Sequence, residues 1–205
     1  MPPLIDLLRA RTGHFRLESG HHGQLWLELE CLFLRPGAIT PLAARLAARL
    51  AGMEIEMVCG PLVEGAFVAL TVAEALGVPF GYAERVQGQG TGLYPVRYRL
   101  PRALRAEVAG KRVVVINDVI NAGSAVRGTV EDLRACGAVP VGIGALLVLG
   151  EWAAEFAREE RLALETLEAR PNPIWAPGAC PLCQGGVALE DLTPVPSPDV
   201  GGEGR

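Results

Sequence analysis

Apolar residues recur along the chain in two rhythms. Residues 36–51 are rich in Ala and Leu and are apolar at spacings of three and four positions, which is typical of one face of an α-helix. Residues 113–116 and 139–149 are nearly continuous apolar runs, as in parallel strands that are buried on both faces. Strand and helix patterns alternate from about residue 54 to residue 150. This alternation predicts an α/β fold with a doubly wound, mainly parallel sheet.

The pattern changes toward both ends of the chain. Residues 25–29 alternate as a half-buried strand does, and residues 151–170 have the spacing of a helix. Beyond Pro171, prolines and glycines dominate. The composition of residues 193–205 predicts a disordered tail.

Composition narrows the class of protein. The 205 residues suit one domain with small appendages. The net charge of −4 and the lack of a long basic run argue against a nucleic-acid partner. The apolar runs are shorter than the roughly 20 residues that span a bilayer, and the N-terminus lacks a signal-like apolar stretch. We therefore expect a cytoplasmic protein with neither a nucleic-acid nor a membrane partner.

One stretch carries candidate chemistry. Residues 113–125, VVVINDVINAGSA, form an apolar strand that ends in a polar pair and a turn of small residues before a helix. Backbone N–H groups at such a helix start bind a phosphate, and Asp118 could accept hydrogen bonds from ribose hydroxyls. The alternative is an ordinary strand–turn–helix connection in which Asn121 or Ser124 only caps the helix. The candidate phosphate-binding residues are Asn121, Ala122, Gly123, Ser124 and Ala125.

The sequence around this motif resembles that of a known enzyme family. Residues 113–138, VVVINDVINAGSAVRGTVEDLRACGA, resemble the signature of type I phosphoribosyltransferases, and more narrowly that of orotate phosphoribosyltransferases. Residues 13–37, 58–85 and 175–190 are similar, in the same order, to that family's N-terminal hood, its pyrophosphate loop with the next strand, and the C-terminal tail of one bacterial branch. The resemblance implies transfer of ribose 5-phosphate from phosphoribosyl pyrophosphate to a pyrimidine base. It also implies a magnesium ion (Mg²⁺) that holds the pyrophosphate, and a homodimer.

The resemblance divides the chain into four expected parts. These are an N-terminal helix with the hood, an α/β core, an extension that contains a CxxC motif, and the disordered tail. Their expected bounds are 1–35, 36–170, 171–192 and 193–205.

Roles follow from the resemblance position by position. The catalytic acid pair falls on Asn117 and Asp118, and the pyrophosphate contacts fall on Glu64 and Arg85. The hood assigns His22 to the base, with an exposed turn histidine as the alternative. For Trp26, base stacking is weighed against a place in the core of the hood.

Several of these positions depart from the family pattern. Asn117 supplies no negative charge to a cationic transition state, and a carboxylate at Glu64 repels a polyanion unless a metal ion intervenes. Residues 86–96 lack the basic residues of the family's mobile loop. Residues 148–149 are Val-Leu where the family has an Arg that pairs with the orotate carboxylate.

These departures leave three hypotheses open. The first is a phosphoribosyltransferase of the orotate type that acts on phosphoribosyl pyrophosphate. The second is a catalytically degraded relative that binds a nucleoside monophosphate or a ribose phosphate as a sensor. The third is a partner subunit whose cleft binds no ligand.

The extension adds a possible metal site. Cys180 and Cys183 form one CxxC, which is half of a four-ligand zinc (Zn²⁺) site. A second subunit or another cysteine could complete it. The alternative is a pair of thiols without a metal, since the sequence has no second CxxC.

Overall fold

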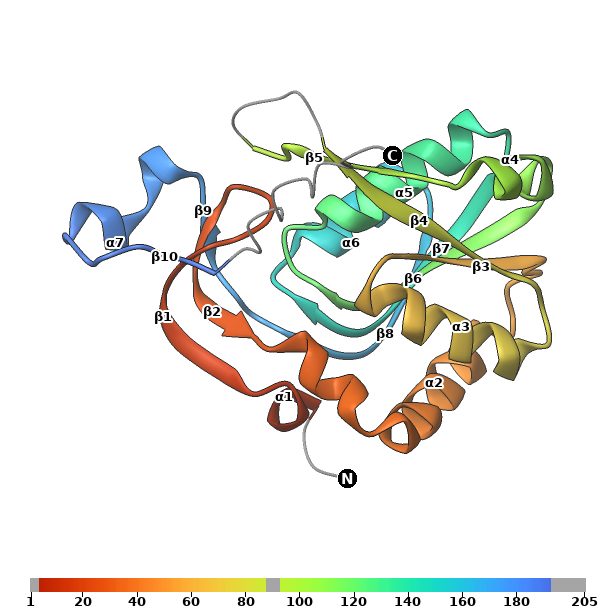
Figure 1. Cartoon of the computed structure of the whole chain (residues 1–205), viewed down its shortest axis with the longest axis horizontal. Helices are drawn as coiled ribbons and strands as arrows, with labels where there is room; N and C mark the ends of the chain where they lie inside the picture. Colours follow the sequence, from red (N-terminus) through yellow and green to blue (C-terminus); the bar gives the residue numbers. More distant parts are fainter. Residues whose placement is uncertain (1–3, 88–92, 193–205) are drawn as a thin grey trace, which may run out of the picture.

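The computed structural model describes residues 4–87 and 93–192 (Figure 1). The predicted tail, residues 193–205, and part of the glycine-rich segment 86–96 lie outside the described residues.

A six-stranded sheet forms the centre of the core, with strand order β5-β4-β3-β6-β7-β8. Each neighbouring pair is parallel except β4 and β5, which are antiparallel. The strands are β3 (Met57–Pro61), β4 (Phe80–Gln87), β5 (Val96–Arg99), β6 (Arg112–Ile120), β7 (Val139–Leu149) and β8 (Ala163–Arg170). The predicted fold class, a doubly wound and mainly parallel sheet, is confirmed.

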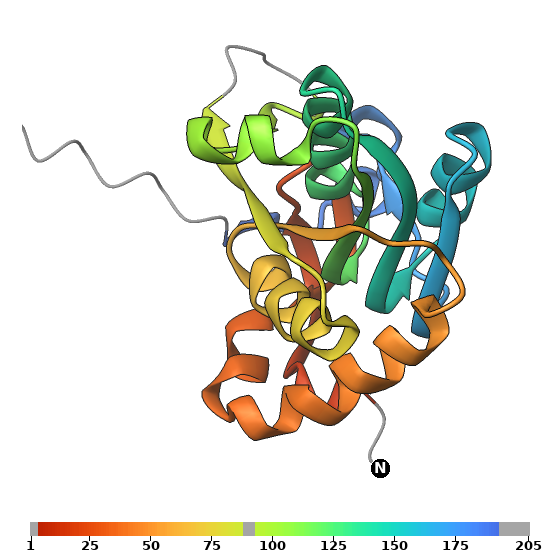
Figure 2. The ribbon, with the colours of Figure 1, turned by 90° about the vertical axis from the view of Figure 1, so that its right-hand side faces the viewer.

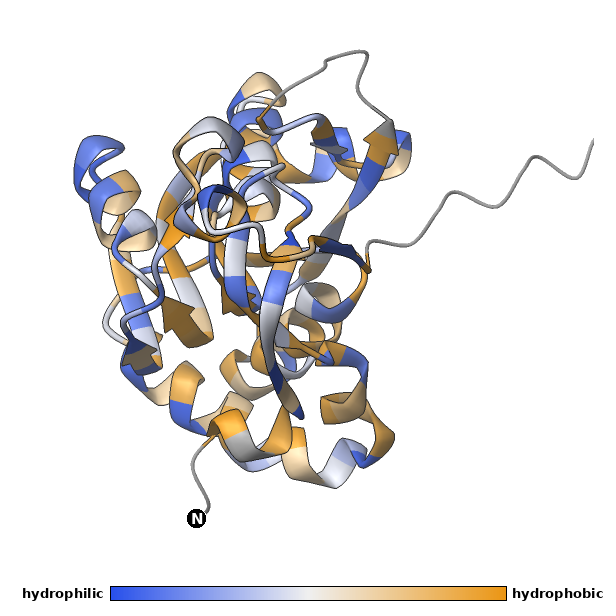
Figure 3. Ribbon diagram, turned by 90° about the vertical axis from the view of Figure 1, so that its left-hand side faces the viewer, coloured by the Kyte–Doolittle hydropathy of each residue, from blue (hydrophilic) through white to orange (hydrophobic). Residues whose placement is uncertain are grey.

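Helices cover both faces of this sheet (Figure 2). On one face, α2 (Pro36–Leu50) and α3 (Glu64–Leu76) bury Leu and Val side chains against β3, β6 and β7. On the other face, α5 (Ser124–Ala135) and α6 (Trp152–Glu159) pack with α4 (Arg102–Val108) over a second apolar cluster. Because β6 is covered on both faces, its residues 113–116 are all fully buried. In Figure 3 hydrophobic and hydrophilic residues alternate along the helices, as expected for helices that cover a core on one side.

The helix predicted over residues 151–170 is wrong in its second half. The helix ends at Glu159, and residues 163–170 form β8, which pairs with β7 and is the edge strand of the sheet as far as residues 4–87 and 93–192 show. The sequence ALETLEAR is only partly buried along its length, so its apolar spacing does not distinguish a helix from an edge strand.

A second sheet of four strands forms the hood at one end of the core, with order β10-β1-β2-β9 (Figure 1). Strands β1 (Ala10–Arg16) and β2 (His22–Leu27) form an antiparallel hairpin, called here the hood hairpin. Strands β9 (Ile174–Trp175) and β10 (Glu190–Asp191) come from the C-terminal extension and pair with β2 and β1. The extension and the N-terminal segment thus fold as one unit.

Short helices flank or connect these strands. They are α1 (Leu4–Leu7), η1 (Leu29–Leu34), η2 (Pro177–Ala179) and α7 (Pro181–Gln184). Among the described residues, no helix has both the length and the apolar character needed to cross a membrane.

Candidate active site

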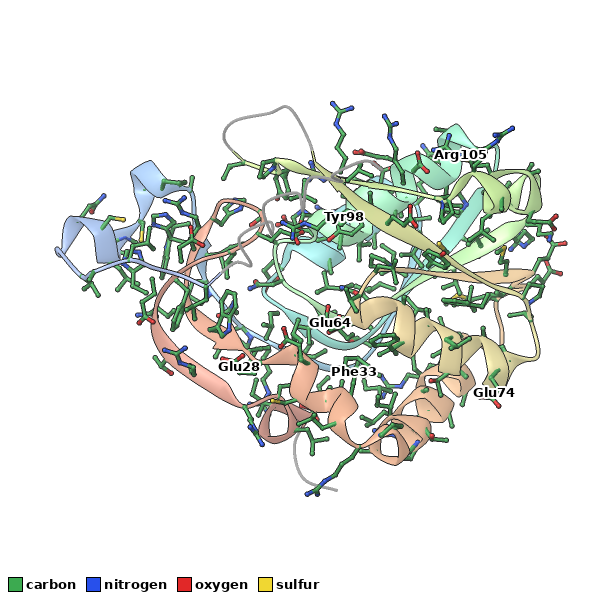
Figure 4. The ribbon with its side chains drawn as sticks, viewed as in Figure 1. Glu28, Phe33, Glu64, Glu74, Tyr98 and Arg105 are labelled. Carbon is green, nitrogen blue, oxygen red and sulfur yellow. The ribbon has the colours of Figure 1, made fainter. Side chains whose placement is uncertain are left out.

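A cavity of about 360 Å³ lies where the carboxyl ends of β3 and β6 meet the hood hairpin. Most of its lining comes from four segments: the hood residues 17–19 and 25–27, residues 61–65 around the β3–α3 connection, and the β6–α5 segment 117–125. Leu29, Glu30, Arg85, Tyr98 and Leu149 complete the lining. Glu64 at the start of α3 and Tyr98 on β5 lie on the side of the core that faces the hood, whereas Glu74 lies at the far end of α3 (Figure 4). Ligands of parallel α/β sheets bind at this edge, so the cavity is the candidate active site.

Asn117 lies within the buried part of β6, and its side-chain amide makes contacts within the protein. Its Nδ2 donates a hydrogen bond to the Val119 carbonyl at 2.8 Å. Its Oδ1 lies against Gly65, where an added Cβ would stand 2.1 Å from that oxygen. A glycine is therefore needed at position 65 to let the β3–α3 loop approach β6.

Asp118 is part of the cavity lining and is almost completely shielded from solvent. It is 3% exposed, and among the described residues its buried Oδ2 has no hydrogen-bond partner. Burial is the main cause that raises the pKa of Asp118 from 3.8 to about 7; the charge of the nearby Glu64 contributes to this rise, and backbone hydrogen bonds oppose it. A buried carboxyl oxygen without a partner is an available acceptor for a ligand that donates a hydrogen bond.

The predicted phosphate loop connects β6 to α5. Gly123 adopts φ +76°, and a Cβ there would lie 1.8 Å from the ring of Trp152, so only glycine fits. Helix α5 begins at Ser124 without a side-chain cap. Its first N–H groups are therefore free of a capping side chain, as a helix N-terminus that binds an anion requires.

Asn121 lines the cavity and also makes a contact within the protein. Its Oδ1 accepts a hydrogen bond from Asn172 Nδ2 at 3.1 Å, which ties the loop to the segment after β8. Tyr94 donates to the Ala122 carbonyl at 3.2 Å. Both contacts hold the loop backbone, while Asn121 through Ala125 all line the cavity.

Sequence reasoning missed Glu18, which stands at the mouth of this loop. Ser124 Oγ and the Tyr98 hydroxyl both donate to Glu18 Oε1, at 3.0 and 3.1 Å. Arg85 Nε lies 3.5 Å from the other carboxylate oxygen, Oε2. The hydroxyl of Ser124, a predicted phosphate contact, therefore donates to the carboxylate of Glu18 in this structure. No local pattern could single out Glu18, because its partners Tyr98 and Ser124 lie far along the chain.

Three acidic side chains and one basic side chain from different segments share this cavity with Asp118. Glu18, Glu30, Glu64 and Arg85 all line it. Burial raises the pKa of Glu64, and the charges of Glu30 and Glu18 raise it further. Within the described chain, Arg85 is the one cation in the lining, and Glu18 already pairs with it.

The two residues predicted to contact the base, Trp26 and His22, lie at different sites in the structure. Trp26 lines the cavity together with Leu25, Leu27 and Leu29. His22 does not line it. Leu149, at the position where the family has its carboxylate-binding Arg, is part of the lining.

His22 belongs instead to a cluster at the outer end of the hood. His14, His22, Cys180 and Cys183 each offer one ligand atom, and these atoms all lie within 4.8 Å of one another. All but Cys183 are buried. This group of two histidines and two cysteines could bind a metal ion.

The sequence of residues 36–164 matches the family described as phosphoribosyl transferase domain. The chain is 35% identical over 176 residues to the orotate phosphoribosyltransferase of Pelotomaculum thermopropionicum, covering 86% of each chain. It is 31% identical over 180 residues to the orotate phosphoribosyltransferase of Thermus thermophilus, covering 88% of this chain and 92% of the relative.

Solved structures agree on the fold. A phosphoribosyltransferase from Corynebacterium diphtheriae superposes with a TM-score of 0.62 at 20% identity, over 81% of this chain and 90% of that one. The orotate phosphoribosyltransferase of Aeropyrum pernix gives 0.58 at 24% identity, over 78% and 87%. Since the sequence match and the fold agree over most of the chain, this protein belongs to the type I phosphoribosyltransferase family.

Proposed function

We propose that the chain is a phosphoribosyltransferase of the orotate type, which transfers ribose 5-phosphate from phosphoribosyl pyrophosphate to a pyrimidine base. One observation carries the proposal: the buried Oδ2 of Asp118, which has no partner within the described part of the chain, and the open N-terminus of α5 belong to one cavity under the hood. Ribose 5-phosphate carries a pair of hydroxyl groups that can donate to Asp118 Oδ2 and a phosphate that can bind at the N-terminus of α5.

The residues would divide the work as follows. Backbone N–H groups at residues 122–125 bind the 5-phosphate, because they stand at a helix N-terminus where the dipole favours an anion. Asp118 accepts hydrogen bonds from the ribose hydroxyls. Those donors favour its ionised form, so the carboxylate gains negative charge beside the carbon of ribose at which positive charge develops.

A magnesium ion fits the acidic side of the cavity. Magnesium prefers oxygen ligands, and Asp118 and Glu64 supply carboxylate oxygens on the same wall. Bound there with the pyrophosphate, it would neutralise the charge of that leaving group. Glu64 would then act through the ion, and Arg85 would contact the pyrophosphate directly.

The base is expected to lie between the hood and the β3–α3 loop. Trp26 and the leucines of the hood provide an apolar wall for a flat ring. Leu149 offers nothing to pair with a carboxylate, so a pyrimidine without that group fits this wall at least as well as orotate.

A second candidate is a protein that binds a nucleoside monophosphate without chemistry. Two hydrogen bonds favour it: Ser124 donates to Glu18, and Asn117 donates to Val119. In both, a side chain that we expected to contact the ligand bonds to another part of the protein. It predicts ligand binding without release of pyrophosphate.

Turnover of phosphoribosyl pyrophosphate tests the proposal. The full chain is incubated with phosphoribosyl pyrophosphate, magnesium and either orotate or uracil, and pyrophosphate and nucleotide are quantified. We expect both products with at least one base, and a loss of at least about 100-fold in Asp118→Asn, because the developing charge loses its partner. Glu131→Gln is the control, since Glu131 is an exposed carboxylate on α5, outside the cavity lining.

Calorimetry with the same ligands separates the candidates. No turnover with either base, but binding of a nucleoside monophosphate, would favour the second candidate. Absence of both turnover and binding would contradict both candidates and leave the partner-subunit hypothesis.

We further propose that the chain forms a homodimer, as the family resemblance implies. An exposed apolar strip on α3 and its N-cap supports this: Val63, Phe67 and Leu70 are 53%, 46% and 52% exposed at helical spacing.

A further inference from the structure

The outer end of the hood gathers four ligand side chains from both ends of the sequence. His14 lies on β1 and His22 begins β2, so the hood hairpin supplies both imidazoles. Cys180 immediately precedes α7, and Cys183 lies within it. Pairing of β9 with β2 and of β10 with β1 brings this short helix back to the hairpin.

Four of the six separations between the ligand atoms are close to the edges of a small tetrahedron, and all six are within 4.8 Å. His14 Nε2 lies 3.2 Å from His22 Nδ1, 3.4 Å from Cys180 Sγ and 3.7 Å from Cys183 Sγ. Cys183 Sγ lies 3.2 Å from His22 Nδ1. Zinc bonds of about 2.0–2.3 Å in tetrahedral geometry place ligand atoms about 3.3–3.8 Å apart. Four such atoms therefore surround a space that fits one zinc ion.

The orientation of His14 also favours a metal. Its Nδ1 lies 2.9 Å from the Val187 carbonyl, which can only accept a hydrogen bond, so Nδ1 carries the proton. The lone pair of Nε2 then points at the other three ligand atoms. A histidine ligand whose second nitrogen donates to a backbone carbonyl is the usual arrangement at metal sites.

We propose that His14, His22, Cys180 and Cys183 hold one structural zinc ion that fastens the C-terminal extension to the hood. Two thiolates and two imidazoles suit zinc better than magnesium or calcium, which prefer oxygen ligands. All four positions are filled by the protein, so no position is open for a substrate or a reactive water. The site therefore differs in role and in place from the magnesium expected in the cavity.

The ion would set one wall of the active site. Residues 17–21 connect the two histidine-bearing strands, and residues 17–19 line the cavity. Binding of His14, His22 and the cysteines of α7 to one ion would hold the two ends of this connection in fixed positions. Loss of zinc would therefore loosen Glu18 and Ser19 as well as the extension.

Metal content of the full chain tests the proposal. Protein purified without chelators should carry about one zinc ion per chain, because the four ligands fill a single tetrahedral site. In the double variant Cys180→Ser/Cys183→Ser, we expect the zinc content to fall at least about tenfold, because both thiolates are lost. The matched control is Cys31→Ser/Cys136→Ser, which removes two thiols that lie outside the cluster and should keep its zinc.

Cobalt substitution of the wild-type chain keeps the proposal testable if the double variant fails to fold. Stripped protein titrated with cobalt should develop thiolate-to-cobalt charge-transfer bands and the strong visible bands of tetrahedral cobalt, and zinc should abolish both. Weak octahedral bands would overturn the proposal. So would zinc-free protein that binds neither metal, or a Cys180–Cys183 disulfide found by mass spectrometry in the freshly purified chain.

Discussion

At the scale of single residues, the burial of Asp118 has a consequence for stability. Its pKa is about 7 in the folded chain and 3.8 ordinarily, so between roughly pH 4 and pH 7 the folded state keeps a proton that the unfolded chain has released. Stability from this group therefore falls as the pH rises through that window. At about 1.4 kcal/mol per pH unit, the loss is at most about 4 kcal/mol by pH 8.

Asp118→Asn removes this titration while keeping the shape of the side chain. We expect the melting temperature of the variant, measured relative to that of the wild type, to rise from pH 5 to about pH 7 and to level off by pH 8. Thermal unfolding at intervals of one pH unit checks this, with Glu131→Gln as the control. A difference that stays constant with pH would show that Asp118 is already ionised in the folded chain.

Glu18 presents a second residue-scale case, because its carboxylate occupies the hydroxyl of Ser124. Glu18→Gln removes a negative charge from the mouth of the phosphate loop and frees Arg85 from an ion pair. We expect a nucleoside monophosphate to bind about tenfold more tightly, which is about 1.4 kcal/mol. Calorimetric titration at fixed ionic strength measures the change.

The control for Glu18→Gln is Glu28→Gln, which changes the net charge equally on a hood residue outside the cavity lining. If both variants bind alike, the gain would come from net charge rather than from the mouth of the loop. Weaker binding in Glu18→Gln would instead make Glu18 a ligand contact.

At the scale of elements, the β6–α5 connection depends on one glycine. Gly123→Ala meets two penalties: a positive φ, which costs roughly 1–2 kcal/mol, and a clash with Trp152, which adds roughly 1–3 kcal/mol as the ring is displaced. Gly110→Ala is the control, because Gly110 has φ +74° with nothing within 4 Å of an added Cβ. Chemical denaturation should show a clearly larger loss for Gly123→Ala. Equal losses would mean that Trp152 moves away freely.

The elements also show where sequence reasoning succeeds. The strand over residues 113–116 and the helix after Gly123 were predictable, because long apolar runs and small-residue turns are local signals. The edge strand β8 was not, since ALETLEAR has no periodicity that separates it from a helix. Glu18 contacts Ser124, and His14 contacts Cys180, across more than 100 positions of the sequence. No local pattern encodes contacts over such separations.

At the scale of the whole molecule, the exposed apolar strip of Val63, Phe67 and Leu70 is the feature that a single copy leaves unexplained. Phe67 also meets Phe33 of η1, with ring centroids 5.2 Å apart, so the strip continues toward the hood (Figure 4). A second copy that covers it would bury apolar surface that costs about 25 cal/mol per Å² in water. Light scattering should then give twice the chain mass of 21.7 kDa.

Leu70→Glu should shift that dimer to the monomer, because a carboxylate would be buried at the contact without a partner. Val139→Glu is the matched control: Val139 is 47% exposed, close to the 52% of Leu70, but it begins β7 rather than lying on α3. We expect this control to remain a dimer at the same concentration. Dissociation of both variants would point to a general loss of folding, which circular dichroism detects. A wild-type chain that is monomeric at micromolar concentration would contradict the assignment of α3 to a subunit interface, and the strip would then need another partner.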